Sequence, residues 1–231
     1  MYSSGIQPVY KQHYCFWRWR IIKVSNKPQL KDIAYRKIKE IIVKGEEEFT
    51  SESSLVNLLS MSRTPIREAL HRLENEGFLK IFSNQGIFFT IPTVEERNEL
   101  FDLRIAIETH AIKQVRVFTN DNISYLKENI KNQHIAFEKK DYQDFNELDM
   151  DFHQYLLEVN GNSHFLKVYK NCRERLMTIR SAKYLLSSRS DVLKELIDDH
   201  KDILENLNKS SNHLSAKILE KHINKGKTNF S

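Results

Sequence analysis

The chain has 231 residues, of which 40% are hydrophobic and 29% are charged, a balance typical of a globular protein that buries a core. No stretch approaches the roughly 20 apolar residues of a membrane span, the N-terminus lacks the apolar core of a secretory signal, and the two cysteines do not form a disulfide framework, so we expect a cytoplasmic protein without membrane contact. The formal net charge of +5 comes from residues 1–30, which hold five basic and no acidic side chains, so charge alone is poor support for nucleic-acid binding.

Residues 1–28 differ from the rest of the chain, because aromatic and basic residues alternate there without a sustained period. Such an arm could contact DNA or a membrane surface. The other interpretations are a disordered tail or translation from an upstream start codon, and we expect one of these two.

Three short helices and a hairpin are expected over residues 29–92. Helical spacing of apolar residues predicts a helix over residues 30–44, which Gly45 ends, and a second helix over about 51–60. A third helix covers residues 64–76, with Pro65 in its first turn and Gly77 after its end. Two β-rich stretches, 78–82 and 87–91, flank the turn sequence of residues 83–86 and predict a hairpin. This order predicts a winged helix-turn-helix.

All four prolines lie before residue 93, so residues 93–231 suit long helices. Their periodicity predicts an all-α bundle with six helices, at about 93–118, 121–139, 141–160, 163–186, 190–208 and 211–225. The expected fold class is therefore mostly α, with a domain boundary near residues 91–93.

The third helix presents a polar face beside its apolar stripe. Arg63, Arg67 and His71 follow a spacing of four, and recognition helices place such side chains in the major groove, where arginine can bond guanine. Ser62 and Thr64 stand at the helix start, where hydroxyl and amide groups can bond phosphate. A charged face alone is usually only a solvated surface, and the position before a hairpin favours DNA binding.

Four polar residues fall on the inward faces of three helices. Asp149 and His153 are four residues apart on one helix, while His200 and His222 lie in or beside the apolar stripes of two others. A buried polar cluster is one interpretation. The other is a divalent transition metal (zinc, nickel, iron or manganese), which would satisfy all four groups.

The segment Ser62–Phe78 closely resembles the S-R-T-P-V-R-E-A-L-x-x-L-E-x-E-G signature of the GntR family of transcription regulators. The resemblance implies that Arg63, Thr64 and Arg67 contact DNA, and that Gly86 lets the wing approach the minor groove. Ser53 stands where relatives often carry an arginine, and the preceding loop is short, so part of the phosphate contact and the operator preference can differ.

Residues 93–231 resemble the FCD domain of the FadR subfamily. Leu148–His153 is similar to its L-D-x-x-F-H motif, and Asp199–Leu204 to its E-H-x-x-I-L motif, with aspartate in place of glutamate. By this resemblance Asp149, His153, His200 and His222 are metal ligands, and the six helices suggest the VanR-like branch. FCD domains typically bind small carboxylates at the metal.

Two arginines are candidates for binding such an effector. Arg104 lies on the inward side of its helix and could clamp a carboxylate, or it could form a structural ion pair with Glu108. Arg175 is a second candidate. We thus expect a homodimeric regulator, a repressor, that binds a palindromic operator and responds to a small organic acid. The alternatives are a metal-dependent, hydrolase-like enzyme and a regulator that senses the metal itself; no catalytic residues are expected.

Overall fold

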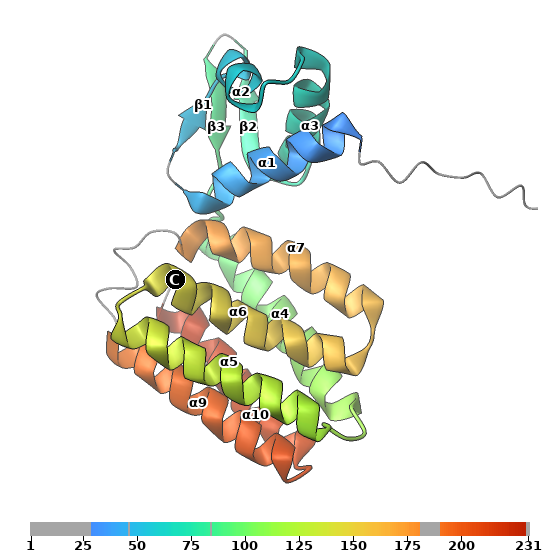
Figure 1. The fold of residues 1–231 in the computed structure, drawn as a ribbon, viewed down its shortest axis with the longest axis vertical. Helices are drawn as coiled ribbons and strands as arrows, with labels where there is room; N and C mark the ends of the chain where they lie inside the picture. Colours follow the sequence, from blue (N-terminus) through green and yellow to red (C-terminus); the bar gives the residue numbers. More distant parts are fainter. Residues whose placement is uncertain (1–28, 46, 84, 181–189, 230–231) are drawn as a thin grey trace, which may run out of the picture.

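The computed structural model describes residues 29–45, 47–83, 85–180 and 190–229. These residues form a small N-terminal domain that lies against the α7 side of a larger helical domain (Figure 1). The predictions made for residues 1–28, and the predicted end of the helix over 163–186, lie outside the described residues.

The N-terminal domain contains three helices: α1 (Leu30–Lys44), α2 (Glu52–Leu59) and α3 (Arg63–Asn75). Gly45 ends α1 in the left-handed conformation that glycine adopts without strain, with φ of 63°. Ser51 caps α2 by accepting a hydrogen bond from the Ser54 amide. A core that includes Ile38, Leu55 and Ile66 holds the helices together, as the periodicity predicted.

A three-stranded sheet completes this domain. Strands β1 (Phe49–Thr50), β2 (Leu79–Phe82) and β3 (Gly86–Phe89) are antiparallel, in the order β1-β3-β2. The prediction of a simple hairpin was therefore incomplete, because β1 was missed. A strand of two residues is too short to show an alternating pattern, and its pairing partner lies almost 40 residues away.

The helical domain has six helices among its described residues: α4 (Val94–Gln114), α5 (Asn120–Glu138), α6 (Tyr142–Asn160), α7 (Ser163–Arg180), α9 (Ser190–Asn208) and α10 (Asn212–Asn229). Thr93, Thr119 and Asp141 cap α4, α5 and α6 with side-chain oxygens, which explains where these helices begin. The fold class predicted from the sequence, a winged helix-turn-helix followed by an all-α bundle, is confirmed.

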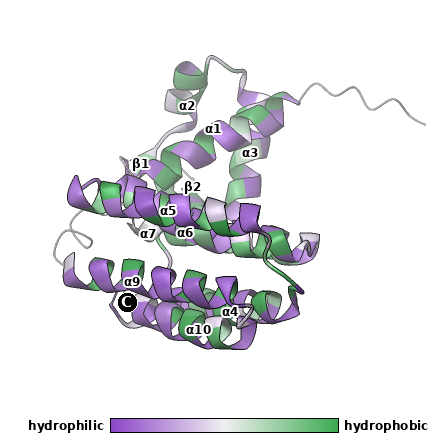
Figure 2. Cartoon of the chain, turned by 60° about the horizontal axis from the view of Figure 1, so that its bottom comes forward, coloured by the Kyte–Doolittle hydropathy of each residue, from purple (hydrophilic) through white to green (hydrophobic). Residues whose placement is uncertain are grey.

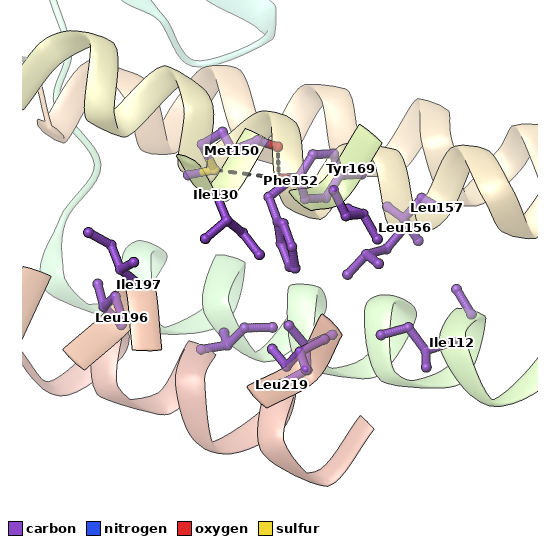
Figure 3. Close-up of a cluster of buried hydrophobic side chains, with 14 of the residues drawn as sticks. Ile112, Ile130, Met150, Phe152, Leu156, Leu157, Tyr169, Leu196, Ile197 and Leu219 are labelled. Atoms are coloured by element: carbon purple, nitrogen blue, oxygen red, sulfur yellow. Dashed lines mark hydrogen bonds between the residues drawn. The ribbon is translucent and has the colours of Figure 1, made fainter. Parts of the chain in front are cut away.

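The six helices pack as two layers, α5–α6–α7 over α9–α10–α4 (Figure 2), and buried hydrophobic side chains from both layers form one core. Figure 3 shows this core, in which Phe152, Leu156 and Tyr169 from the first layer approach Leu219 and Ile112 from the second. The Tyr169 hydroxyl donates to the Met150 carbonyl oxygen at 2.9 Å. Helix α7 is the part of the bundle that lies nearest the N-terminal domain (Figure 1). Among the described residues, none of the helices has the length and apolar character needed to cross a membrane.

Candidate functional site

The four side chains expected to bind metal meet between the two layers of the bundle. Asp149 and His153 come from α6, His200 from α9 and His222 from α10. All four are buried, and their potential ligand atoms lie within 4.8 Å of one another. His153 Nε2 and His222 Nε2 are 3.1 Å apart, while Asp149 Oδ1 is 3.8 Å from His200 Nε2 and 3.9 Å from His222 Nε2. The three ε-nitrogens and the carboxylate thus face one small volume.

A chain of hydrogen bonds orients His200. The Leu148 carbonyl oxygen can only accept, so Asn129 directs its amide nitrogen there at 3.1 Å and its oxygen toward Gln133. Gln133 donates to that oxygen at 2.7 Å and presents its own oxygen to His200 Nδ1 at 2.9 Å. His200 Nδ1 must therefore carry the proton, and its Nε2 keeps a lone pair. Within the described part of the chain, this buried Nε2 has no hydrogen-bond partner.

Glu108 orients His153 in the same way. Its carboxylate accepts from Arg104 Nε at 2.7 Å and lies 2.6 Å from His153 Nδ1. Burial favours the neutral acid, but the positive charge of Arg104 and the contact with His153 outweigh it and lower the pKa of Glu108. Burial lowers the pKa of His153 to about 4, so at neutral pH a neutral imidazole donates from Nδ1 and directs the Nε2 lone pair inward.

An acidic residue also lies behind His222. Asp199 Oδ2 is 3.6 Å from His222 Nδ1, and Lys225 Nζ approaches the same carboxylate at 2.9 Å. Burial opposes the charge of Asp199, yet the nearby His222 and Lys225 lower its pKa. With its proton on Nδ1 toward Asp199, His222 would present a third lone pair from Nε2.

This donor set fits a divalent transition metal ion. Two nitrogens bound about 2.0–2.1 Å from one ion are separated by about 3 Å, which matches the distance between His153 Nε2 and His222 Nε2. Three converging lone pairs and a carboxylate repel one another unless a cation or proton lies between them. Outer groups that hold the δ-nitrogens, as Glu108 and Gln133 do, are also characteristic of metal-binding histidines.

Arg104 forms the structural ion pair that was one of the two roles considered for it. The side chain is 2% exposed and forms the predicted ion pair with Glu108 through Nε. Its Nη2 is buried and has no hydrogen-bond partner among the described residues. Burial disfavours the charge, but Glu108, Tyr169 and Asp149 keep the pKa of Arg104 above its ordinary value. Arg104 thus keeps its positive charge and one N–H group without a partner among the described residues, and only Glu108 lies between it and His153.

Arg175 is not brought to this cluster. Its Nη2 donates to Glu96 Oε1 at 2.7 Å, and its Nη1 donates to the Thr90 carbonyl oxygen at 3.4 Å. The guanidinium also lies over the Phe78 ring, 5.2 Å from its centre. These partners belong to the N-terminal domain and to the start of α4, so Arg175 lies at the junction of the two domains.

The surface expected to read DNA is open to solvent. The side chains of Arg63, Arg67 and His71 are 68%, 59% and 69% exposed, and Ser62 and Thr64 at the start of α3 are exposed too. The opposite face of α3 is buried against the domain core, as the apolar stripe predicted. The helix therefore offers a continuous polar face of the kind that enters a major groove.

Two features of this surface were not expected from the sequence. Glu52 in the first turn of α2 accepts a hydrogen bond from Arg67 Nε at 2.7 Å and lies 3.9 Å from Arg63 Nε. Gly86 has φ of +110°, and a Cβ there would lie 3.0 Å from the Thr50 carbonyl oxygen. The close pairing of β1 with β3 thus requires glycine at position 86, independently of any contact between the wing and DNA.

Sequence reasoning also missed the outer groups of the histidine cluster. Asn129 and Gln133 are spaced by four among the buried apolar positions of α5, and this spacing was a usable signal of inward polar groups. Glu108 was considered only as a partner of Arg104. Its second contact, with His153, depends on how α4 packs on α6.

The comparisons with known proteins agree with this architecture. The gntR family of bacterial regulatory proteins matches residues 30–89, and the FCD domain matches residues 99–225. The HTH-type transcriptional repressor RspR of Escherichia coli (strain K12) is 27% identical over 75% of this chain and 75% of its own length. The gluconate operon transcriptional repressor of Bacillus licheniformis is 29% identical over 68% of this chain and 62% of its own length. The solved structure of E. coli McbR/YncC shares the fold, with a TM-score of 0.71 at 18% identity over 88% of this chain and 98% of the other. The chain therefore belongs to the gntR family of bacterial regulatory proteins and carries an FCD domain.

Proposed function

We propose that this protein is a homodimeric repressor whose affinity for a palindromic operator is controlled by a small organic acid. In this proposal residues 29–92 bind DNA through Ser62, Arg63, Thr64 and Arg67. His71 and Gly86 lie at the edges of this DNA-binding surface. Residues 93–231 bind the effector and form the dimer. The names of the relatives RspR and the gluconate operon repressor support the assignment as a repressor.

The observation that carries the effector proposal is the buried cluster of Asp149, His153, His200 and His222 beside a buried arginine. These four residues would hold the metal ion, which would supply positive charge and open coordination positions to an anionic ligand. Arg104 Nη2, which lacks a partner among the described residues, would donate to the same carboxylate. A small acid matches both features, because each requires a negatively charged oxygen.

Effector binding would act on DNA through the packing of the bundle. The cluster joins α6 to α9 and α10, and a ligand with different affinities for two arrangements of these helices shifts their populations. The spacing of two recognition helices in a dimer would change with that arrangement, and so would the affinity for a palindrome. Placement in the VanR-like branch is part of this proposal and rests on the six helices.

The test is a metal analysis of the purified protein, combined with a thermal-shift screen of small organic acids. Stoichiometric metal and a stabilising acid are expected, because a ligand that binds only the folded state raises its apparent stability. The double variant His200→Ala/His222→Ala should lose tight metal binding. Metal without a stabilising acid would favour a metal sensor, turnover of esters, amides or phosphates would favour a hydrolase, and absence of metal after reloading would leave only a buried polar cluster.

A further inference from the structure

The two domains meet along α7, where two consecutive residues form ion pairs of opposite polarity. Glu174 pairs with Lys39 of α1, and Arg175 pairs with Glu96 at the start of α4 while also donating to the Thr90 carbonyl oxygen. We call these contacts the junction pairs. The Glu174–Lys39 pair crosses directly between the domains. The Arg175–Glu96 pair lies within the helical domain, and Arg175 reaches the N-terminal domain through the Thr90 carbonyl oxygen and the Phe78 ring.

Phe78 lies between the two cations of the junction pairs. Its ring is 2% exposed, with Lys39 Nζ 4.2 Å and Arg175 Cζ 5.2 Å from its centre. Phe78 lies three residues after the last residue of α3, so this contact lies just beyond the C-terminal end of the proposed DNA-reading helix. Lys39 and Arg175 are each only 7% exposed, so both charges are largely withdrawn from water and depend on their partners.

The same helix also contacts the candidate effector site. About one and a half turns before the junction pairs, the Tyr169 ring centre is 5.8 Å from the guanidinium of Arg104, and its hydroxyl donates to the Met150 carbonyl oxygen next to Asp149. Cys172 Sγ donates to the Leu100 carbonyl oxygen of α4 at 3.4 Å. One face of α7 therefore runs from the surroundings of Arg104 to the N-terminal domain.

We propose that Glu174 and Arg175 are positioning residues for DNA binding: they fix the orientation of the DNA-reading domain on the helical domain. This inference rests on the proposed function, since orientation matters only where two recognition helices must match a palindrome. A domain held in one orientation loses less freedom when it binds than one that moves about its connecting segment. Breaking the junction pairs should therefore weaken operator binding, although neither residue contacts DNA.

The test uses the full-length protein without effector and the double variant Glu174→Gln/Arg175→Gln. The matched control is Arg173→Gln on the same helix, because Arg173 bonds Asp151 and Gln154 of α6 and, among the described residues, forms no ion pair or hydrogen bond with the N-terminal domain. Hydrogen exchange over residues 77–97 and α1 reports how firmly the domain is held, and fluorescence anisotropy gives the dissociation constant for an operator selected with the wild type.

In the double variant we expect exchange of residues 77–97 to accelerate at least threefold and the dissociation constant to rise about threefold to tenfold, as for partly exposed charged pairs. Arg173→Gln should change neither quantity, and the exchanged pair Arg175→Glu/Glu96→Arg should bind the operator better than Arg175→Glu alone. Unchanged exchange and affinity in the double variant, or equal effects from Arg173→Gln, would overturn the inference. If the wild type selected no DNA, the proposed function would fail, while the exchange data would still decide whether these residues hold the domain.

Discussion

Glu108 provides the sharpest test of how the candidate site is built. Its carboxylate is fully buried and contacts two groups at once, Arg104 Nε at 2.7 Å and His153 Nδ1 at 2.6 Å. The substitution Glu108→Gln keeps the size of the side chain but removes the only charge that directly contacts the buried guanidinium among the described residues. Removing one partner of a buried ion pair typically costs about 3–5 kcal/mol, because the other charge is left without compensation.

We therefore expect Glu108→Gln to lower the free energy of unfolding by about 3–5 kcal/mol, measured by urea denaturation in the presence of a chelator. The chelator separates this effect from any loss of metal. Glu99→Gln is the matched control, since Glu99 is an exposed glutamate on the same helix and such changes usually stay within about 0.5 kcal/mol. Adding Arg104→Met to Glu108→Gln should recover at least about 1 kcal/mol, because the uncompensated cation is then gone. A loss below about 1 kcal/mol for Glu108→Gln would refute the assignment of a charged, buried pair.

Three further changes test the site and the DNA surface. Gln133→Leu should weaken metal binding about 10–100-fold in a chelator competition, because His200 loses the acceptor that orients it, whereas Gln143→Leu on the surface should have no effect. Arg67→Ala should cost about 1–3 kcal/mol of operator affinity and relax the preference at one base pair, measured by anisotropy with operator variants; Arg36→Ala, on an exposed face of α1, should do neither. Glu52→Gln should raise the affinity for non-operator DNA severalfold, because it removes a negative charge that lies 2.7 Å from Arg67. An unchanged affinity for non-operator DNA over a series of salt concentrations would show that Glu52 does not weaken this binding.

The helices could be predicted because local signals determine them. Glycine ends α1, serine and threonine cap α2 and α4, and the apolar stripe of α3 is periodic over its whole length. The strand β1 could not be predicted, because its two residues are defined only by pairing with β3. Periodicity also placed Asp149 and His153 on an inward face, but their distances to His222 depend on how three helices pack.

The two arginines proposed as effector ligands illustrate the same limit. Both Arg104 and Arg175 lie among apolar positions and are buried, so periodicity treats them alike. Tertiary packing separates them: Arg104 contacts the histidine cluster through Glu108, while Arg175 contacts Glu96 and the Thr90 carbonyl oxygen at the domain junction. Periodicity predicts that a side chain points inward. It does not predict which end of the bundle, or which neighbouring domain, a long side chain reaches.

Stability alone does not explain the polar groups in the bundle core. Asp149, three histidines, Glu108 and Arg104 occupy positions where apolar side chains of similar volume often give equal or greater stability. What this arrangement provides instead is direction: Glu108 and Gln133 hold the δ-nitrogens of His153 and His200, so that the ε-nitrogens face the volume shared by α6, α9 and α10. Because that volume lies between the two layers, a ligand bound there would contact both of them. Helix α7 packs in one layer and contacts the N-terminal domain through Glu174 and Arg175. In the proposed mechanism, a shift between the layers would therefore reach α3 through α7.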